Sequence, residues 1–162
     1  MDKKSPTQWH PAFYSGIQIE LKEYEHILSF ENEHALTKKP LLIDVLIIKK
    51  RTEEPINKNL GRIFLKHNIV EYKSPTDYVS IDDYYKVIGY ACLYKQDVRT
   101  ANEIKQNEIT ITLVSRRYPR TLISHLKTER NLIVEKQDSG IYYVKGCLFP
   151  AQIIVTKELS MG

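Results

Sequence analysis

The chain has 162 residues, 42% hydrophobic and 27% charged, and its 24 basic and 20 acidic residues give a net charge of +4, which permits a polyanionic partner without requiring one. This profile is typical of one globular domain over residues 1–162. No apolar run approaches the roughly 20 residues that span a bilayer, and the sequence shows no signal segment. We therefore expect a cytoplasmic protein without membrane contact. Cys92 and Cys147 lack C-x-x-C or metal-ligand spacing, which argues against a disulfide framework or a zinc site and predicts two small core residues.

The first part of the chain predicts a helix followed by two strands. Between Pro11 and Glu25 an apolar residue recurs every three or four positions, which indicates an amphipathic helix. Residues 26–36 partly alternate between apolar and polar, and turn residues then lead into a strong apolar run at 41–48. This pattern favours a hairpin, and the polar stretch at 51–59 that follows is typical of a loop.

A third strand and a second helix are expected in the middle of the chain. The strand covers residues 67–73 and ends at a Ser-Pro pair. Ser80 then provides a helix cap, and two aspartates after it favour the positive N-terminal end of a helix. An apolar stripe that includes Cys92 extends this helix to about Lys95.

The last part of the chain predicts a strand, a helix and three short strands. These elements are expected at 109–114, 120–130, 132–134, 141–144 and 151–155. The residues Gln137-Asp138-Ser139-Gly140 form the turn of a hairpin. Because the sequence has no internal repeat or flexible linker, we expect one α/β domain with a mixed central β-sheet flanked by helices.

Charged residues interrupt two of the apolar strands. Asp44 lies in the run at 41–48, and Glu71 and Lys73 lie in the strand at 67–73. Side chains alternate along a strand, so Glu71 and Lys73 share a face, and pairing with the Asp44 strand would gather two carboxylates and one ammonium. Such a cluster can hold a divalent metal ion and activate a water molecule. Its simpler interpretation is a buried ion pair between Asp44 and Lys73 without catalysis.

An Asp in one strand followed by Glu-x-Lys in the next resembles the PD-(D/E)XK nuclease superfamily. The matching residues are Asp44 and Glu71-Tyr72-Lys73, and the resemblance covers roughly residues 11–114. It implies a restriction-endonuclease-like α-β-β-β-α-β core, to which the last strands add a C-terminal β extension. The chain looks similar to uncharacterised bacterial members, including transposase-like ones. It departs from the family pattern at Ile43, which replaces a proline that is not a metal ligand.

The resemblance implies a metal-dependent nuclease that hydrolyses the phosphodiester bonds of nucleic acid. Asp44 and Glu71 would hold Mg²⁺ or Mn²⁺, because hard divalent ions prefer carboxylate oxygens. Lys73 would position the attacking water or help to deprotonate it, and we favour the positioning role.

The two long helices are expected to add further residues to the site. Superfamily members often contribute a glutamate from the first helix, and Glu20 is the candidate here, with Glu31 and Glu33 as alternatives. A polar residue of the helix after Glu-x-Lys also assists in the family, and Tyr85 or Lys86 stands at that place. The simpler interpretation of Glu20, Tyr85 and Lys86 is that they are exposed helix residues.

Two basic clusters are expected to contact phosphate groups. Lys49 and Lys50 end one strand, and Arg116, Arg117 and Arg120 stand at a strand-to-helix junction. Both clusters are also typical of solvated strand ends. The expected partner is nucleic acid, DNA rather than RNA, and a homodimer is permitted.

Two other functions stay open. One is a catalytically inactive nuclease-like scaffold that binds nucleic acid or protein, and the other, less favoured, is a metal-binding phosphoesterase for a small nucleotide. Metal binding that is lost in Asp44→Ala separates the nuclease from the scaffold. The five histidines show no metal-ligand spacing, and no Ser-His-Asp order can be argued from them.

Overall fold

The computed structural model describes residues 10–32, 45–73 and 79–159. In chain order its main elements are α1 (His10–Glu20), β1 (Leu28–Asn32), β2 (Val45–Lys50), β3 (His67–Tyr72), α2 (Ile81–Gln96), β4 (Ile109–Ser115), α3 (Arg120–Ser124), β5 (Ile133–Asp138), β6 (Ile141–Lys145) and β7 (Ala151–Val155). Single helical turns are η2 (Lys22–Tyr24), η3 (Asn59–Gly61), η4 (Gln106–Glu108) and η6 (Thr156–Glu158), and the π-helical η5 (His125–Glu129) continues α3. Asp44 and Glu33 lie outside the described residues.

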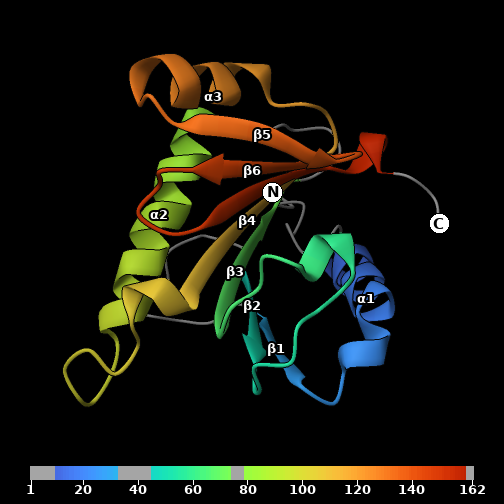
Figure 1. The fold of residues 1–162 in the computed structure, drawn as a ribbon, viewed down its shortest axis with the longest axis vertical. Helices are drawn as coiled ribbons and strands as arrows, with labels where there is room; N and C mark the ends of the chain where they lie inside the picture. Colours follow the sequence, from blue (N-terminus) through green and yellow to red (C-terminus); the bar gives the residue numbers. More distant parts are fainter. Residues whose placement is uncertain (1–9, 33–44, 74–78, 160–162) are drawn as a thin grey trace, which may run out of the picture.

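The seven strands form one mixed sheet in the order β1-β2-β3-β4-β7-β6-β5 (Figure 1). β1, β2 and β3 are antiparallel neighbours, β3, β4 and β7 run parallel, and β6 and β5 add an antiparallel hairpin at the far edge. The last strand of the chain, β7, therefore lies inside the sheet and joins its two halves. This arrangement confirms the expected mixed sheet flanked by helices.

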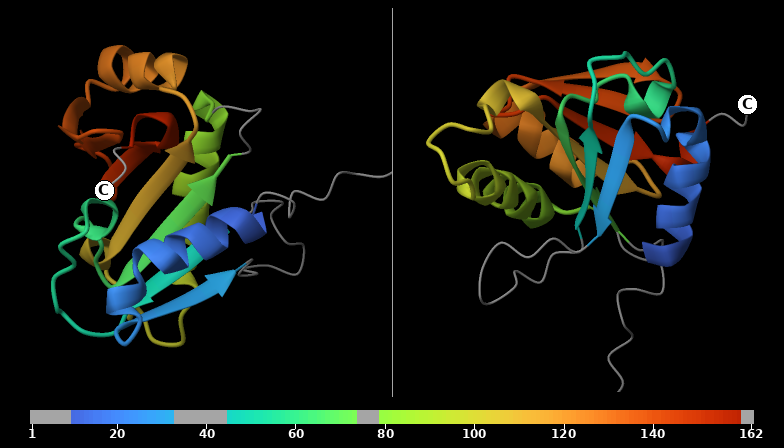
Figure 2. Two further views of the ribbon diagram at one scale, coloured as in Figure 1. Left: turned by 90° about the vertical axis from the view of Figure 1, so that its right-hand side faces the viewer. Right: turned by 90° about the horizontal axis from the view of Figure 1, so that it is seen from below.

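Helices cover both faces of the sheet, which creates two hydrophobic cores (Figure 2). On one face, Ile17 and Leu21 of the α1 region pack against Ile48 and Val70. On the other face, α2 and α3 pack together over the alternate residues of the same strands, among them Ile69. Because both faces are covered, β4 and β7 are buried along their whole length and β3 up to Glu71.

A capping box fixes the start of α2, the longest helix that the structure describes. The Ser80 hydroxyl accepts a hydrogen bond from the Asp83 N–H at 3.0 Å, and the Asp83 carboxylate accepts one from the Ser80 N–H at 2.8 Å.

The expectation that both cysteines lie in the core is wrong. Ala91 is on the buried side of α2, so Cys92, about 100° further round the helix, is exposed, and Cys147 is half-buried. Among the described residues, no helix combines the length and apolarity needed to cross a membrane.

Candidate functional site

Glu71 lies at the carboxyl end of β3, in the interior of the sheet. Val45 of β2 pairs with it on one side and Leu113 of β4 on the other. Ile69, two residues earlier, belongs to the core under α2, so the alternation of side chains places Glu71 on the face that α2 covers. The Glu71 side chain is buried there.

Lys73 follows β3 and is held by two groups. Its backbone N–H donates a hydrogen bond to the Val114 carbonyl at 3.1 Å, which continues the pairing with β4. Its Nζ lies 3.1 Å from Asp83 Oδ1 at the start of α2. The Lys73 side chain is 27% exposed and that of Asp83 8% exposed, so the ammonium reaches solvent while its partner carboxylate does not. The ammonium of Lys73 therefore contacts the cap of α2.

Asp83 is a buried carboxylate that stays ionised. Burial alone would raise its pKa, but the hydrogen bond from the Ser80 backbone and the contact with the Lys73 ammonium together lower the pKa below its ordinary value of 3.8. The two carboxylate oxygens are used separately, because Oδ1 faces Lys73 and Oδ2 accepts from Ser80. The side chain thus fixes both the start of α2 and the position of Lys73.

The donor set for a divalent cation is incomplete in the described part of the chain. Glu71 supplies carboxylate oxygens of the type that Mg²⁺ prefers. The second expected carboxylate, Asp44, belongs to residues that the structure does not describe. Among the described residues, no group of three or more His, Cys, Asp or Glu side chains is arranged to hold a metal ion.

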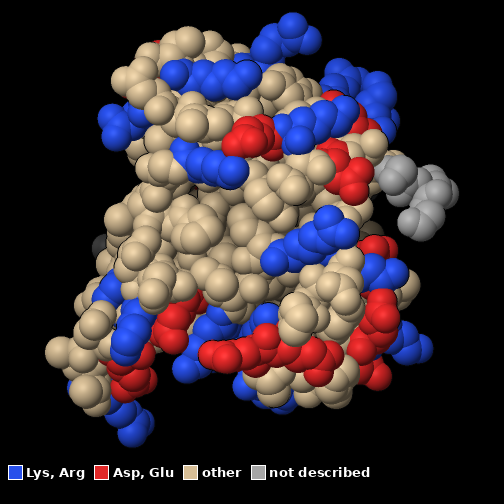
Figure 3. Space-filling view, in the orientation of Figure 1, with Lys and Arg blue, Asp and Glu red and all other residues tan. Residues whose placement is uncertain are grey.

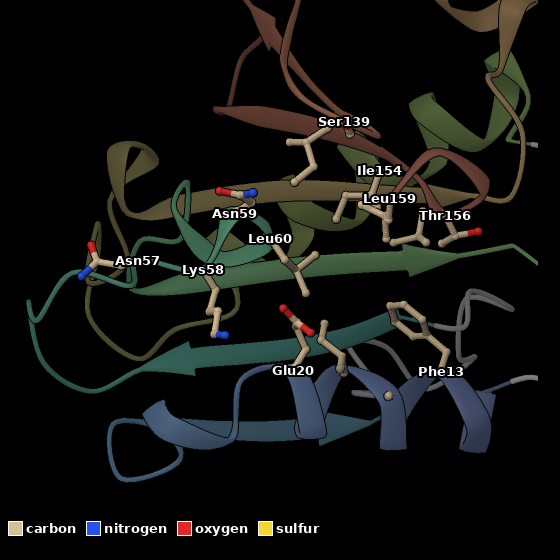
Figure 4. Close-up of a pocket in the computed structure, with 14 residues that line it drawn as sticks. Phe13, Glu20, Asn57, Lys58, Asn59, Leu60, Ser139, Ile154, Thr156 and Leu159 are labelled. Carbon is tan, nitrogen blue, oxygen red and sulfur yellow. The ribbon is translucent and has the colours of Figure 1, made fainter. Parts of the chain in front are cut away.

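Glu20 lies on the other face of the sheet from the contact between Lys73 and Asp83. It ends α1 and lines a pocket of about 470 Å³ beside Phe13, Lys58 and Thr156. Figure 4 shows Glu20 and Lys58 reaching into this pocket from opposite walls. The structure therefore does not bring Glu20 together with Lys73.

The basic residues at the end of β2 lie far from Lys73 along the sheet. Lys49 pairs with His67, four residues before Glu71 on β3, which corresponds to about 13 Å along the strand. Its ammonium lies 3.8 Å from a carboxylate oxygen of Glu31, a partly exposed pair on adjacent strands. Lys50 is the next residue along β2 and shares this position at the far end of the sheet.

The arginines after β4 are placed at the same end of the sheet as Lys73. β4 runs parallel to β3, so its carboxyl end, followed by Arg116 and Arg117, lies near the end of β3. Arg117 and Arg120 line a pocket of about 490 Å³ whose lining also includes Ser80 of the α2 cap. Lys and Arg side chains also gather over α3 and β5 at the top of Figure 3. One of the two expected basic clusters thus borders the candidate site.

Tyr85 belongs to a hydrogen-bonded chain that the sequence did not predict. Its hydroxyl lies 2.7 Å from His125 Nε2, and His125 Nδ1 lies 2.9 Å from Glu129 Oε2. The four-residue spacing of His125 and Glu129 along one helical segment was the sequence signal for their contact. Tyr85 is 40 residues away from His125, and only the packing of α2 against α3 places its hydroxyl next to the imidazole. Lys86, the neighbouring candidate, is exposed.

No family model, no curated protein and no solved structure matches this chain. The geometry of its own residues therefore carries the assignment of function.

Proposed function

We propose that this chain is a metal-dependent nuclease of the PD-(D/E)XK type, acting on nucleic-acid phosphodiester bonds at the carboxyl end of β3. The observation that carries the proposal is the placement of Lys73. Its ammonium is held by the buried Asp83 at the end of an interior strand, two residues after the buried Glu71. A pocket lined by Arg117 and Arg120 adjoins the same helix cap.

The order of elements supports the same proposal. α1, β1, β2, β3, α2 and β4 follow one another in the α-β-β-β-α-β order that the sequence resemblance implies. β1 to β3 are antiparallel and β4 returns parallel to β3, so the α2 crossover sets its N-terminus beside the end of β3. The hairpin β5–β6 and β7 correspond to the expected C-terminal extension.

Each residue has a chemical part in the proposed reaction. Glu71, together with Asp44, would hold Mg²⁺ or Mn²⁺, which when bound lowers the pKa of a coordinated water and offsets charge on the phosphate. Asp83 holds the Lys73 ammonium at a fixed place, which suits the positioning of the attacking water. Arg117 and Arg120 present guanidinium groups, whose planar donors match phosphate oxygens and give contacts without sequence information.

A nuclease-like scaffold without catalysis is the second candidate, because the same ion pair also has a purely structural explanation. Asp83 caps α2 and neutralises Lys73, and this needs no substrate. On this interpretation the cluster contributes to the fold, and the basic residues bind nucleic acid or protein.

Cleavage of labelled single- and double-stranded DNA and RNA in Mg²⁺, Mn²⁺ or EDTA separates the two. We expect cleavage that requires metal and prefers DNA, with Glu71→Gln and Lys73→Ala slower by about 10²-fold or more. Lys145→Ala is the matched control, since Lys145 forms a surface ion pair with Glu135 at 2.8 Å on the distant hairpin and should keep full activity. No cleavage under any condition, together with no Mg²⁺ or Mn²⁺ binding by calorimetry, would overturn the nuclease in favour of the scaffold.

A further inference from the structure

Tyr85 of α2 and His125 and Glu129 of η5 form a hydrogen-bonded series of three side chains between the two helical segments. Tyr85 is 44% exposed, so its hydroxyl is accessible from solvent. The His125 side chain is only 10% exposed, and the Glu129 side chain is 69% exposed. The imidazole is therefore held by packing, with an accessible phenol on one side and an accessible carboxylate on the other.

The hydrogen bonds define which of these three side chains donates and which accepts. A carboxylate only accepts, so His125 Nδ1–H donates to Glu129 and leaves Nε2 as the acceptor for the Tyr85 hydroxyl. A hydroxyl bonded to an imidazole that is itself oriented by a carboxylate is the arrangement that activates nucleophiles in covalent catalysis. The 2.7 Å and 2.9 Å contacts lie within the range that proton transfer requires.

Two other hydrogen-bonded tyrosines, Tyr142 and Tyr94, differ from Tyr85. The Tyr142 hydroxyl donates directly to the Glu158 carboxylate, and burial and that contact raise its pKa to about 12. Tyr94 also meets a histidine, His67, but this pair is buried and burial raises the Tyr94 pKa to about 12. Tyr85 combines an exposed phenol with an oriented imidazole.

The pocket that contains Arg117 and Arg120 lies next to these three side chains in the sequence of both helices. Ile81 and Asp82 precede Tyr85 by four and three residues, and Thr121 precedes His125 by four, and all three line the pocket of about 490 Å³. The backbone positions of these pocket residues therefore lie about one helical turn, roughly 5.4 Å along the helix axis, before those of Tyr85 and His125. The guanidinium groups of that pocket suit a phosphate ester.

We propose that Tyr85 is a nucleophile that attacks the phosphorus of a phosphodiester bound at the arginine-lined pocket and takes over the phosphate together with its second ester group. As the Tyr85 oxygen forms its bond to phosphorus, the phenolic proton passes to His125 Nε2, and the imidazolium is stabilised by Glu129. The bond from phosphorus to the leaving oxygen breaks, and the leaving group departs as a stable phenolate or recovers the proton from His125. The products are a phosphodiester between Tyr85 and the retained ester group, and the released alcohol or phenolate.

The nucleophile of this reaction is separate from the metal site of the proposed hydrolysis, although both reactions would bind phosphate at Arg117 and Arg120. Asp83 points to β3 and Lys73, whereas Tyr85, two residues later on α2, points to α3. The two sites lie on different sides of the same helix, and the phosphoryl transfer to Tyr85 requires none of the residues assigned to the metal site. Its test is therefore run in EDTA.

Bis(4-nitrophenyl) phosphate is the probe for this reaction. We expect a burst of about one equivalent of 4-nitrophenolate per chain and a 4-nitrophenyl phosphate adduct that mass spectrometry maps to Tyr85. Tyr85→Phe should abolish both, and His125→Asn should slow the burst by about 10²-fold. Arg117→Gln and Arg120→Gln should raise the probe concentration that gives the half-maximal burst rate.

The matched variants guard against a folding defect. Glu129 is largely exposed, so Glu129→Ala should fold normally and slow the burst several-fold, while Glu129→Gln, which keeps an acceptor for Nδ1–H, should recover part of the rate. Tyr142→Phe removes a tyrosine without an oriented histidine and should leave the burst unchanged. Adducts spread over several tyrosines, or a burst unaffected by both Glu129→Ala and His125→Asn, would show simple chemical modification and overturn the proposal.

Discussion

Asp83 links the local structure of a helix to the candidate site. It accepts hydrogen bonds from backbone and side chain partners on both of its oxygens, and it is buried. Without such partners burial would raise the pKa of this carboxyl, because burial penalises the charged form. Its ionisation therefore depends on Ser80 and Lys73, and the position of Lys73 depends in turn on Asp83.

The stability contributed by Asp83 should depend on pH. Its folded-state pKa lies below the ordinary value of 3.8, so its contribution is complete above that value and is lost as the pH falls through the folded-state pKa. Asp83→Asn should therefore cost about 1.5–3 kcal/mol at pH 7 and clearly less at pH 3, measured by urea unfolding. Asp82→Asn, in the same helical turn but exposed, is the control and should have little effect at either pH. An equal loss at both pH values for Asp83→Asn would contradict this reasoning.

The sequence predicted part of the candidate site. Glu71 and Lys73 could be placed together because strand alternation is a local rule. Asp83 could be assigned only to the start of a helix, since its contact with Lys73 depends on how α2 packs on β3. The separation of Lys49 from the site follows from the antiparallel register of β2, which local pattern does not reveal.

At the scale of elements, α2 carries a glycine in its interior that packing does not require. A Cβ added at Gly89 would meet no atom within 4 Å, and the residue is exposed. Glycine in a helix interior is less favourable than alanine because it loses more backbone freedom on folding. Gly89→Ala should therefore stabilise the protein by about 0.5–1 kcal/mol, measured by thermal or urea unfolding.

Gly61 in η3 is the contrasting position. A Cβ there would lie 2.7 Å from Cγ2 of Ile56, which is buried and branched at Cβ, and 3.3 Å from the Leu21 side chain. Gly61→Ala should therefore destabilise the protein by about 1–3 kcal/mol through overpacking between η3 and the α1 region. If both substitutions changed the free energy of unfolding in the same direction, the space around these glycines would not be the deciding factor.

The elements themselves followed from local pattern more closely than their ends did. The periodic helix at 11–25 and the capped helix from Ser80 correspond to α1 and α2, although α1 ends at Glu20 and a separate turn, η2, follows. The helix expected at 120–130 is split into α3 and the π-helical η5. Such changes in helix type depend on packing, since the residues concerned, including the buried Leu126, meet α2 and the sheet.

At the scale of the whole molecule, the position of β7 could not be predicted from the sequence. The residues at 151–155 indicate a buried strand, but local pattern does not say that the strand enters between β4 and β6. That placement needs long-range pairing, which joins the sheet half that begins at β1 to the hairpin β5–β6. The expectation of a single domain stays a prediction, and substitutions in β7 can test it.

Two adjacent residues of β7 reach the two different cores, so substitutions there test whether the chain unfolds as one unit. Ile153 packs in the core under α2 and Ile154 in the core under α1, and both are buried. Ile153→Ala and Ile154→Ala should each cost about 2–5 kcal/mol, whereas Ile133→Ala on the exposed edge strand β5 should cost less than about 0.5 kcal/mol.

The form of the unfolding transition decides the question. Because β7 contributes to both cores, each destabilised variant should keep one cooperative transition in urea, with the same slope as the wild type and with circular dichroism and tyrosine fluorescence changing together. Two separate transitions in Ile154→Ala, with the core under α1 lost first, would show that the two faces of the sheet unfold independently. In that case the contact between Asp83 of α2 and Lys73 would survive the loss of the core under α1. The candidate site would then depend on packing on one face of the sheet alone.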